Sequence, residues 1–469
     1  MDAGGQILKT RDDHVPVPLS RCTEPVDPSK PFTVPKEVDC SWAITEEPFG
    51  PERIRPRIEP WLTALVQSEH LSLLVGSGLT HGVHGLATPQ SLPGMGGISF
   101  DVLDDEIQEE ARRTAKLAGR DPGNFEDQIR AANELLRGLE IIGATKGESA
   151  GERKDAEALR KCLTAALESF AGSILDGERD LVAAPVEMRT EAFNYLVSFL
   201  MSFASRTGTR ERLNLFTTNY DRYIEAGADV AGLRLIDRFV GTLSPVFRAS
   251  RLDIDLHYNP PGIRGEPRYL EGVARFTKLH GSIDWVDSGD AIRRVGLPFG
   301  APEAMPYFPE GGFEGDRAMR LMVYPNAAKD RETASHPYVE LFRDFAATIC
   351  RPNSTLVCYG YSFGDEHINR VIEDMLTIPS AHLVVIAYSD SLSRVLSTYE
   401  RLGRHAQVTL MLGDHLGDLR ALVDHYLPKP AIDRTTFRMA ELLKARWASG
   451  ESARTTDETS RAEADGSES

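Results

Sequence analysis

The sequence has few cysteines, and none of them are paired at a metal-binding spacing. The five cysteines are odd in number and include no C-x-x-C pair. This distribution argues against a disulfide framework and against a four-cysteine zinc site. The sequence therefore favours reduced thiols, and with them a cytoplasmic location.

Long apolar runs and an excess of positive charge are missing as well. No stretch approaches the roughly 18 apolar residues that a membrane span requires, and residues 1–13 contain no apolar core of a secretory signal. The 53 Lys and Arg residues are outnumbered by 70 Asp and Glu residues, so the formal net charge is -17. A chain this acidic binds phosphate backbones poorly. We therefore expect neither membrane insertion nor direct contact with nucleic acid.

The sequence does contain enough apolar material for a large core. Hydrophobic residues make up 41% and charged residues 26% of the 469 positions. These values are typical of globular proteins and exclude wholesale disorder and fibrous classes. The length allows about three domains, or one domain elaborated by arms and insertions.

Proline content and helical spacing divide the chain into segments. Residues 1–50 carry prolines every few positions, which indicates an extended arm; the sequence leaves open whether it covers its own body, reaches another subunit or stays loose. Residues 101–206 show helical spacing and predict a helical insertion, in which Asn124 caps one helix. The flanking ranges, 51–100 and 207–425, are expected to form the main domain.

Two further predictions concern the C-terminal end and one glycine-rich stretch. Residues 426–448 are expected to form a C-terminal helix, and the acidic residues 449–469 a disordered tail. Residues 81–98 are rich in Gly, His and Pro, which predicts a loop.

Short β-branched or aromatic runs alternate with helical stretches through the main domain. This alternation predicts an α/β fold, a doubly wound and mostly parallel Rossmann-like sheet that carries the helical insertion. A short helix is expected over 53–68. Strands are expected over 71–76, 213–218, 275–281, 321–325, 354–360, 382–388 and 407–412.

Four segments place glycine or polar residues directly after an expected strand. Ligands of open α/β sheets bind outside the carboxyl ends of the strands, so these segments should converge in space. They are Gly76–Thr80, Thr217–Asp221, Lys278–Ser282 and Gly360–Asp365.

Each segment also has a purely structural interpretation. The first can be a plain strand-to-loop turn, and the second a strand end before an Asp-capped helix. His280 can be a buried or capping histidine, although a histidine followed by glycine at a strand end is also suited to accept a proton near neutral pH. Asp365 is expected to cap the next helix in either case.

Taken in order, the four segments resemble the motifs of the sirtuin family. The resemblance covers about residues 60–390, interrupted by the insertion. Gly76–Thr80 is similar to the G-A-G-x-S loop, and Thr217–Asp221 to T-Q-N-x-D with Thr218 in place of Gln. Leu279-His280-Gly281 is similar to L-H-G, and Gly360–Phe363 to G-T-S-L.

Residues 322–346 and 358–372 are closer still to one branch, because they resemble bacterial sirtuin-like effectors of anti-phage defence systems. The chain departs from sirtuin deacylases in lacking the four-cysteine zinc module and in the loop that follows the glycine motif. Both features help to place an acyl-lysine peptide, so their change puts protein deacylation in doubt. No zinc is expected.

The resemblance implies roles for individual residues. Asn219 would hold the nicotinamide ribose of NAD and orient a water, Asp221 would support that site, and His280 would act as general base on the ribose hydroxyls. The remaining NAD contacts would come from Gly76, Ser77, Gly78, Thr80, Thr218, Gly360 and Ser362.

The implied function is cleavage of NAD, used as a substrate, to nicotinamide and ADP-ribose, by an effector that depletes NAD in anti-phage defence. The resemblance also implies self-assembly and a partner protein such as an ATPase or an Argonaute-type sensor. Two alternatives remain open. One is an NAD-dependent deacylase or ADP-ribosyl transferase using the same centre, and the other is a scaffold that binds NAD without turning it over.

Overall fold

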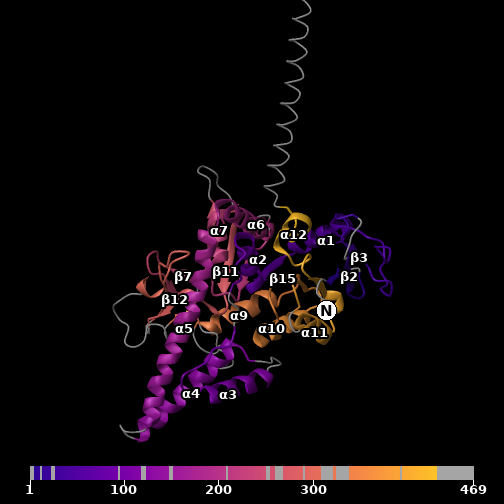
Figure 1. The fold of residues 1–469 in the computed structure, drawn as a ribbon. Helices are drawn as coiled ribbons and strands as arrows, with labels where there is room; N and C mark the ends of the chain where they lie inside the picture. The colour runs from indigo at the N-terminus through magenta and orange to yellow at the C-terminus, as the bar shows by residue number, and fades with distance from the viewer. Residues whose placement is uncertain are drawn as a thin grey trace, which may run out of the picture. The chain divides into compact units, whose positions relative to one another are not determined.

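The central element of the computed structural model is a mixed sheet of ten described strands (Figure 1). The structure describes residues 5–10, 13–22, 27–92, 96–117, 123–146, 151–206, 210–249, 254–258, 268–288, 291–307, 321–323, 337–390 and 393–429. Residues 1–427 form one compact unit, which is described below. The predicted acidic tail 449–469, and the predicted C-terminal helix from residue 430 onwards, lie outside the described residues.

Seven neighbouring strands of the sheet are parallel, and their order reverses once. From β4 the chain adds β5 and β11 on one side, then returns to place β15 beside β4 and adds β16 and β17 on the other side. This is the doubly wound order, and the reversal between β4 and β15 is its topological switch point. The predicted fold class is therefore confirmed. The strands are β4 (His70–Val75), β5 (Leu213–Thr217), β6 (Arg234–Ile236), β11 (Val273–Lys278), β15 (Ser354–Tyr359), β16 (His382–Ala387) and β17 (Val408–Leu412).

Helices cover both faces of the sheet because its strands are apolar on both sides. In β4, Leu73 and Val75 belong to one core cluster, whereas Leu74 belongs to the cluster on the opposite face. The first face is covered by α1 (Pro51–Val66), α2 (Ser77–Ala87), α6 (Val186–Ala204), α7 (Tyr223–Ala231) and α12 (Leu419–Ala421). The second face is covered by α9 (Tyr338–Ile349), α10 (Glu366–Leu376) and α11 (Arg394–Leu402).

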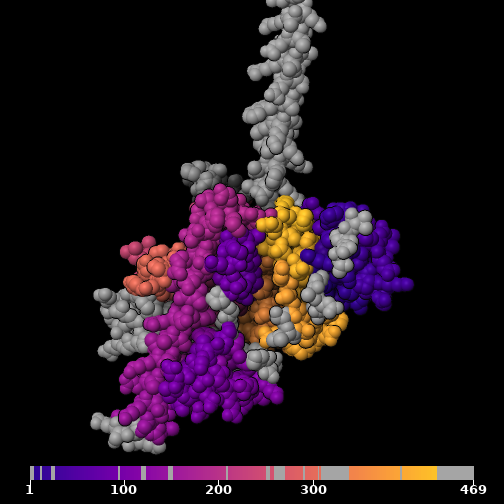
Figure 2. Space-filling model, viewed as in Figure 1, coloured from indigo at the N-terminus to yellow at the C-terminus, as the bar shows by residue number. Residues whose placement is uncertain are grey.

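The described part of the N-terminal arm lies against the protein's own body. Strand β1 (Gln6–Lys9) pairs antiparallel with β17, so that Ile7 faces Leu412 across the ladder. Strands β2 (Val17–Arg21) and β3 (Phe32–Thr33) continue the sheet outward. The last described helical turn, η6 (Leu422–Tyr426), packs beside α1 (Figure 2).

The helical segment divides among three hydrophobic clusters, one of which contains Ala171 and Leu175. Helices α3 (Asp104–Leu117) and α4 (Phe125–Lys146) pack with the first half of α5 (Gly151–Ala183) around a cluster of their own. The end of α5 and all of α6 instead join the core of the main sheet. Asn124 caps α4 as predicted, since its Oδ1 accepts a hydrogen bond of 3.1 Å from the N–H of Asp127.

A second, five-stranded sheet is built from strands that lie on both sides of β11 in the chain. It contains β7 (Phe239–Val240), β8 (Val246–Phe247), β12 (Gly281–Asp287), β13 (Ile292–Arg294) and β14 (Leu321–Val323). A two-stranded sheet of β9 (His257–Tyr258) and β10 (Arg268–Tyr269), and the short turns η2 (Met305–Tyr307) and η5 (His405–Gln407), complete the described elements.

The loop predicted over residues 81–98 is wrong in its first part, because α2 runs from Ser77 to Ala87. Glycine disfavours a helix by about 1 kcal/mol relative to alanine, which is why the composition predicted a loop. At Gly78, packing favours glycine over alanine, because a Cβ there would lie 2.5 Å from the Cα of Gly360. The close contact between the two backbones requires glycine in the first turn of the helix.

Candidate active site

A cavity of about 360 Å³ lies at the switch point of the sheet, within the size range of small-molecule sites. The carboxyl ends of β4, β5, β11 and β15 meet there, as the strand-end rule predicted. The cavity is lined by nine of the ten residues singled out from the sequence: Gly76, Ser77, Thr80, Thr218, Asn219, Asp221, His280, Gly360 and Ser362. Gly78 is not in the lining and instead supports it from behind.

The glycines of the first and fourth segments hold two loops together. The N–H of Gly76 donates to the carbonyl of Tyr359, and the N–H of Gly78 to the carbonyl of Gly360, each at 3.0 Å. Gly360 has φ +61°, a left-handed conformation that suits glycine. These two N–H groups are therefore already hydrogen-bonded within the protein and do not bind a ligand. What α2 offers a bound phosphate is the positive end of its helix dipole and the exposed Ser77.

Asn219 is held by a directional chain of hydrogen bonds. Its Nδ2 donates to the carbonyl of Gly76 and to Oγ1 of Thr80, each at 3.0 Å. The Thr80 hydroxyl in turn donates to Oδ2 of Asp221 at 2.7 Å. Because both amide hydrogens of Asn219 are committed, its Oδ1 is the atom left to accept a hydrogen bond from a ligand or water. Asn219 is 8% exposed, so that acceptor sits in a largely water-excluded place.

Asp221 and Lys278 fix the loop that carries Asn219. The Oδ1 of Asp221 accepts from the N–H of Tyr223 at 3.2 Å, which caps the start of α7. From β11, Nζ of Lys278 donates to the carbonyls of Tyr220 and Asp221. The capping role expected of Asp221 and its support of Asn219 therefore coexist in one carboxylate.

His280 is oriented by an acidic partner from the fourth segment. Its Nε2 lies 2.8 Å from Oδ2 of Asp365, and its side chain is 11% exposed. The other oxygen of Asp365 accepts from the N–H of His367 at 3.0 Å and so caps α10, as predicted. An ionised carboxylate can only accept, so neutral His280 carries its proton on Nε2 and keeps Nδ1 as the proton acceptor.

The helical segment forms a wall of the cavity that the sequence did not indicate. Glu126 at the start of α4 and Phe170 in α5 both line it. Phe170 stacks on Phe125 at 4.7 Å between ring centroids and meets Tyr220 edge-on at 5.8 Å. Helical spacing predicts which residues share a face, but not which distant loop that face will contact.

Arg394 is a further lining residue that sequence reasoning missed. It opens α11 shortly after β16, so the rule that led to the other four segments would have found it. An arginine is suited to bind phosphate oxygens through two parallel hydrogen bonds. Two histidines of α2 lie nearby. His81 lines the cavity, whereas burial lowers the pKa of His84 and its Nδ1 lies 3.2 Å from the Tyr223 hydroxyl.

Residues 213–407 match the family model described as a SIR2-like domain, and no curated protein matches the chain. The matched range includes Asn219, Asp221, His280 and Asp365 but begins after the Gly76–Thr80 segment. The match supports a sirtuin-like domain, and such a domain implies use of NAD.

The cavity fits NAD in the character of its lining. Gly76 and Gly360 present no side chain, and a Cβ at Gly76 would lie 2.4 Å from the Gly360 carbonyl oxygen. Asn219 and His280 supply a polar end, and Arg394 a cation. Within the described ranges, no group of His, Cys, Asp and Glu is arranged to hold a metal ion, and no helix is long and apolar enough to cross a membrane.

Part of the first stretch that resembles anti-phage effectors lies outside the described residues. Of residues 322–346, those from 324 to 336 lie outside the described residues. The second stretch, 358–372, contains the Asp365 cap and the loop that contacts Gly78.

Proposed function

We propose that this chain is an NAD glycohydrolase, which converts NAD⁺ and water to nicotinamide, ADP-ribose and a proton. The observation that carries the proposal is the pairing of Asn219 and His280 in one cavity. Each is fixed by a second group, Thr80 in one case and Asp365 in the other. The glycine-lined turns beside them provide room for the dinucleotide.

The chemistry requires little acid catalysis. The bond between C1′ of the ribose and the nicotinamide nitrogen breaks, and nicotinamide leaves as a neutral molecule with both bonding electrons. Water then bonds to C1′ and loses a proton. The transition state has the oxocarbenium character of other glycoside cleavages. An oriented polar cage and a base near the ribose are the groups that lower its barrier.

The residues of this chain supply both groups. Oδ1 of Asn219 is the acceptor that orients a ribose hydroxyl or the attacking water. Nδ1 of His280 accepts the proton, and the carboxylate of Asp365 stabilises the imidazolium that results. Asp221 acts through Thr80 to keep the Asn219 amide in one orientation.

The burial of these groups supports hydrolysis over modification of another protein. Asn219 and His280 are both close to fully buried, and the helical segment forms one wall of the cavity. A small molecule and a water reach such groups more readily than a lysine on a folded protein. Deacylation and ADP-ribosyl transfer remain the alternative, and they give acylated ADP-ribose or labelled protein in place of free ADP-ribose.

The wider role rests on the resemblance to anti-phage effectors. We infer that the chain depletes cellular NAD when triggered, in a self-assembled complex with a sensor such as an ATPase or an Argonaute-type protein. Unrestrained hydrolysis of NAD is toxic, so the helical wall of the cavity is a natural place for a partner to restrain or release activity.

The test is NAD consumption by the assembled protein, with nicotinamide and ADP-ribose quantified by chromatography. We expect equal amounts of the two products from the wild type, and at least a 100-fold loss in Asn219→Ala and His280→Ala, in line with the usual contribution of a positioned base. His14→Ala, which changes an exposed histidine, serves as the matched control. Full turnover by either cavity variant would refute the mechanism, and intact NAD with every variant would favour a binding scaffold.

A further inference from the structure

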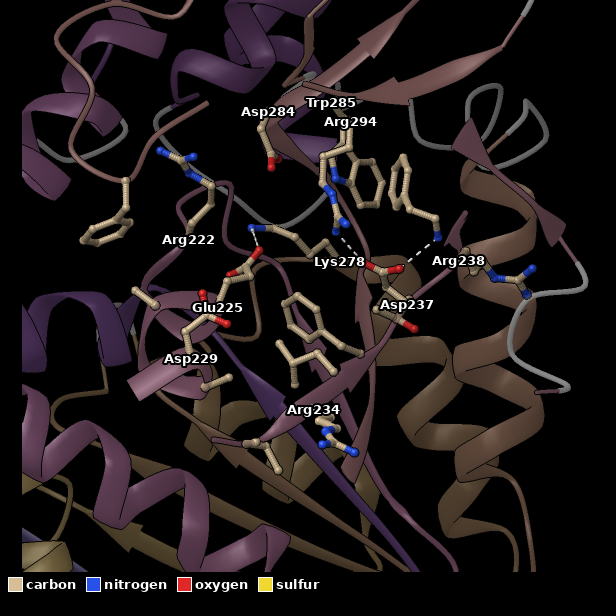
Figure 3. Close-up of a pocket in the computed structure, with 18 of the residues that line it drawn as sticks. Arg222, Glu225, Asp229, Arg234, Asp237, Arg238, Lys278, Asp284, Trp285 and Arg294 are labelled. Carbon is tan, nitrogen blue, oxygen red and sulfur yellow. Dashed lines mark hydrogen bonds and ion pairs between the residues drawn. The ribbon is translucent and has the colours of Figure 1, made fainter. Parts of the chain in front are cut away.

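A second cavity, of about 780 Å³, lies between the main sheet and the smaller one (Figure 3). Its floor comes from α7, β6 and the end of β11, and its opposite wall from the small sheet, including Trp285 of β12 and Arg294 of β13. It shares no lining residue with the candidate active site. No role has been given to it so far.

Four of the five cations in the lining are already engaged by carboxylates, and the fifth, Arg234, is exposed. Nζ of Lys278 lies 3.0 Å from Oε1 of Glu225, and Arg294 is paired with Asp237. Arg222 and Arg238 are paired with Glu178 and Asp344, which lie outside the lining. An anion that enters the buried part of the cavity would therefore have to compete with existing ion pairs.

Two carboxylate oxygens in the cavity, in contrast to these paired cations, have no hydrogen-bond partner among the described residues. They are Oδ1 of Asp284 and Oε2 of Glu225, and both are buried. Asp284 is 8% exposed, and its carboxylate points toward Lys278 and Glu225 (Figure 3). Leaving such an oxygen unpaired costs about 1–3 kcal/mol, more when it is charged, so native structures rarely keep one without a reason. Among the described residues of this lining, Nη1 of Arg238 is the one donor that is likewise buried without a hydrogen-bond partner.

Aromatic rings line the same cavity. Phe239 and Trp285 meet at 4.8 Å between ring centroids, and the guanidinium of Arg294 lies 5.1 Å from the ring centroid of Phe239. The wall thus already binds one cation through a ring face. Ring faces together with unpaired carboxylates are the combination that stabilises a desolvated cation.

We propose that this cavity binds a guanidinium or ammonium group of a ligand, with Asp284 and Glu225 accepting its hydrogen bonds and Trp285 and Phe239 covering it. The electrostatics agree with this placement. The pKa of Glu225 is raised to about 7, because burial raises it, the Lys278 ammonium opposes that rise, and the neighbouring carboxylate of Asp284 adds to it. A bound cation would offset the repulsion between the two carboxylates.

The cavity is connected to the candidate active site through one side chain. Nζ of Lys278 donates to Glu225 and also to the carbonyls of Tyr220 and Asp221. Tyr220 and Asp221 directly follow Asn219 in the same loop. A cation that competes for Glu225 would shift Lys278 toward those carbonyls. Occupancy of this cavity by a cation should therefore change the KM for NAD. That expectation rests on the proposed function, whereas the prediction that the cation binds does not.

Direct calorimetric titration tests the proposal on the full chain. The probes are L-argininamide and spermidine, with uncharged L-citrullinamide and inorganic phosphate as comparisons. We expect argininamide to bind at least about 10-fold more tightly than citrullinamide, because a hydrogen bond to a charged group is worth roughly that factor or more. A capped tripeptide with a central arginine distinguishes a partner's side chain from a free small cation as the source, according to which of them binds more tightly.

Variants localise the binding. Asp284→Asn and Glu225→Gln should each weaken argininamide binding by about 10-fold or more. Asp105→Asn, which makes the same charge change at an exposed position in α3, should leave it unchanged. If Asp284→Asn does not fold, Glu225→Gln carries the test. Equal binding of citrullinamide or phosphate, no binding of any cation up to millimolar concentration, or binding unaffected by both variants would overturn the proposal, whatever the result of the NAD assay.

Discussion

Replacement of Asp365 by asparagine separates two functions of one carboxylate. One oxygen caps α10 through the N–H of His367, and the other lies 2.8 Å from Nε2 of His280. Asparagine is as good a helix cap as aspartate, so the helix should be kept. The amide nitrogen would then face His280 and present a donor to a donor. The histidine must respond by moving its proton to Nδ1, which removes the proposed proton acceptor.

The expected loss follows from the kind of hydrogen bond removed. A hydrogen bond to a charged group contributes about 1.5–3 kcal/mol, which corresponds to roughly a 10- to 150-fold fall in kcat/KM if it acts only in the transition state. The free energy of unfolding should change by less than about 0.5 kcal/mol, because the cap survives. The loss should fall on kcat and leave KM unchanged, a split that a merely structural role would not produce.

The assay compares NAD turnover and urea denaturation for Asp365→Asn and Asp365→Ala. Alanine removes the cap as well, so it should cost about 1 kcal/mol of stability in addition to activity. Wild-type turnover in Asp365→Asn, or a loss of activity that follows stability in both variants, would show that Asp365 does not position His280.

Three further predictions concern stability. Gly360→Ala should destabilise the protein by about 2 kcal/mol or more in urea denaturation, because φ is +61° and the new Cβ would lie 2.5 Å from the Cα of Gly78; an unchanged midpoint would contradict that packing. Glu178→Gln should cost about 3–5 kcal/mol, since it leaves Arg222 buried without its counter-charge, and a loss below 1 kcal/mol would mean that the pair is exchangeable. Burial and the nearby cations lower the pKa of His415 to about 4, so the unfolded chain binds more protons than the folded protein between about pH 6.5 and 4. The contribution of His415 to the free energy of unfolding is complete above pH 6.5 and is lost as the pH falls toward 4. His415→Gln should therefore flatten that part of the stability–pH curve.

The location of the candidate site could be predicted from the sequence because it follows from topology. Buried runs such as residues 71–76 are recognisable as parallel strands, and parallel strands bring their carboxyl ends to one edge. The cap at Asp365 was predictable for a similar reason, since capping depends on neighbours in the chain. His280 therefore stood out without any knowledge of its contacts, whereas Asn219 was singled out by the resemblance to sirtuins.

Features that depend on distant contacts could not be predicted. Glycines in α2 lower helix propensity, but Leu79, Val83 and Ala87 of the helix are buried in the core, and the contact with Gly360 explains the glycine at position 78. Glu126 and Phe170 reach the cavity through the packing of the helical segment, which no local pattern encodes. Proline spacing likewise showed that the arm is extended but not which surface it meets.

The position of β1 has a consequence for how the protein is made. Gln6 hydrogen-bonds through its side chain with Asp414, 408 positions away, and its Oε1 accepts from the N–H groups of His415 and Leu416. During synthesis, β17 must therefore emerge before β1 can pair with it, and contacts over such separations form slowly. Between the emergence of β17 and its pairing with β1, the edge of β17 is exposed to other chains. Bulky fusions before β1 should thus lower the yield of native protein by prolonging that exposure, whereas fusions at the other end should not.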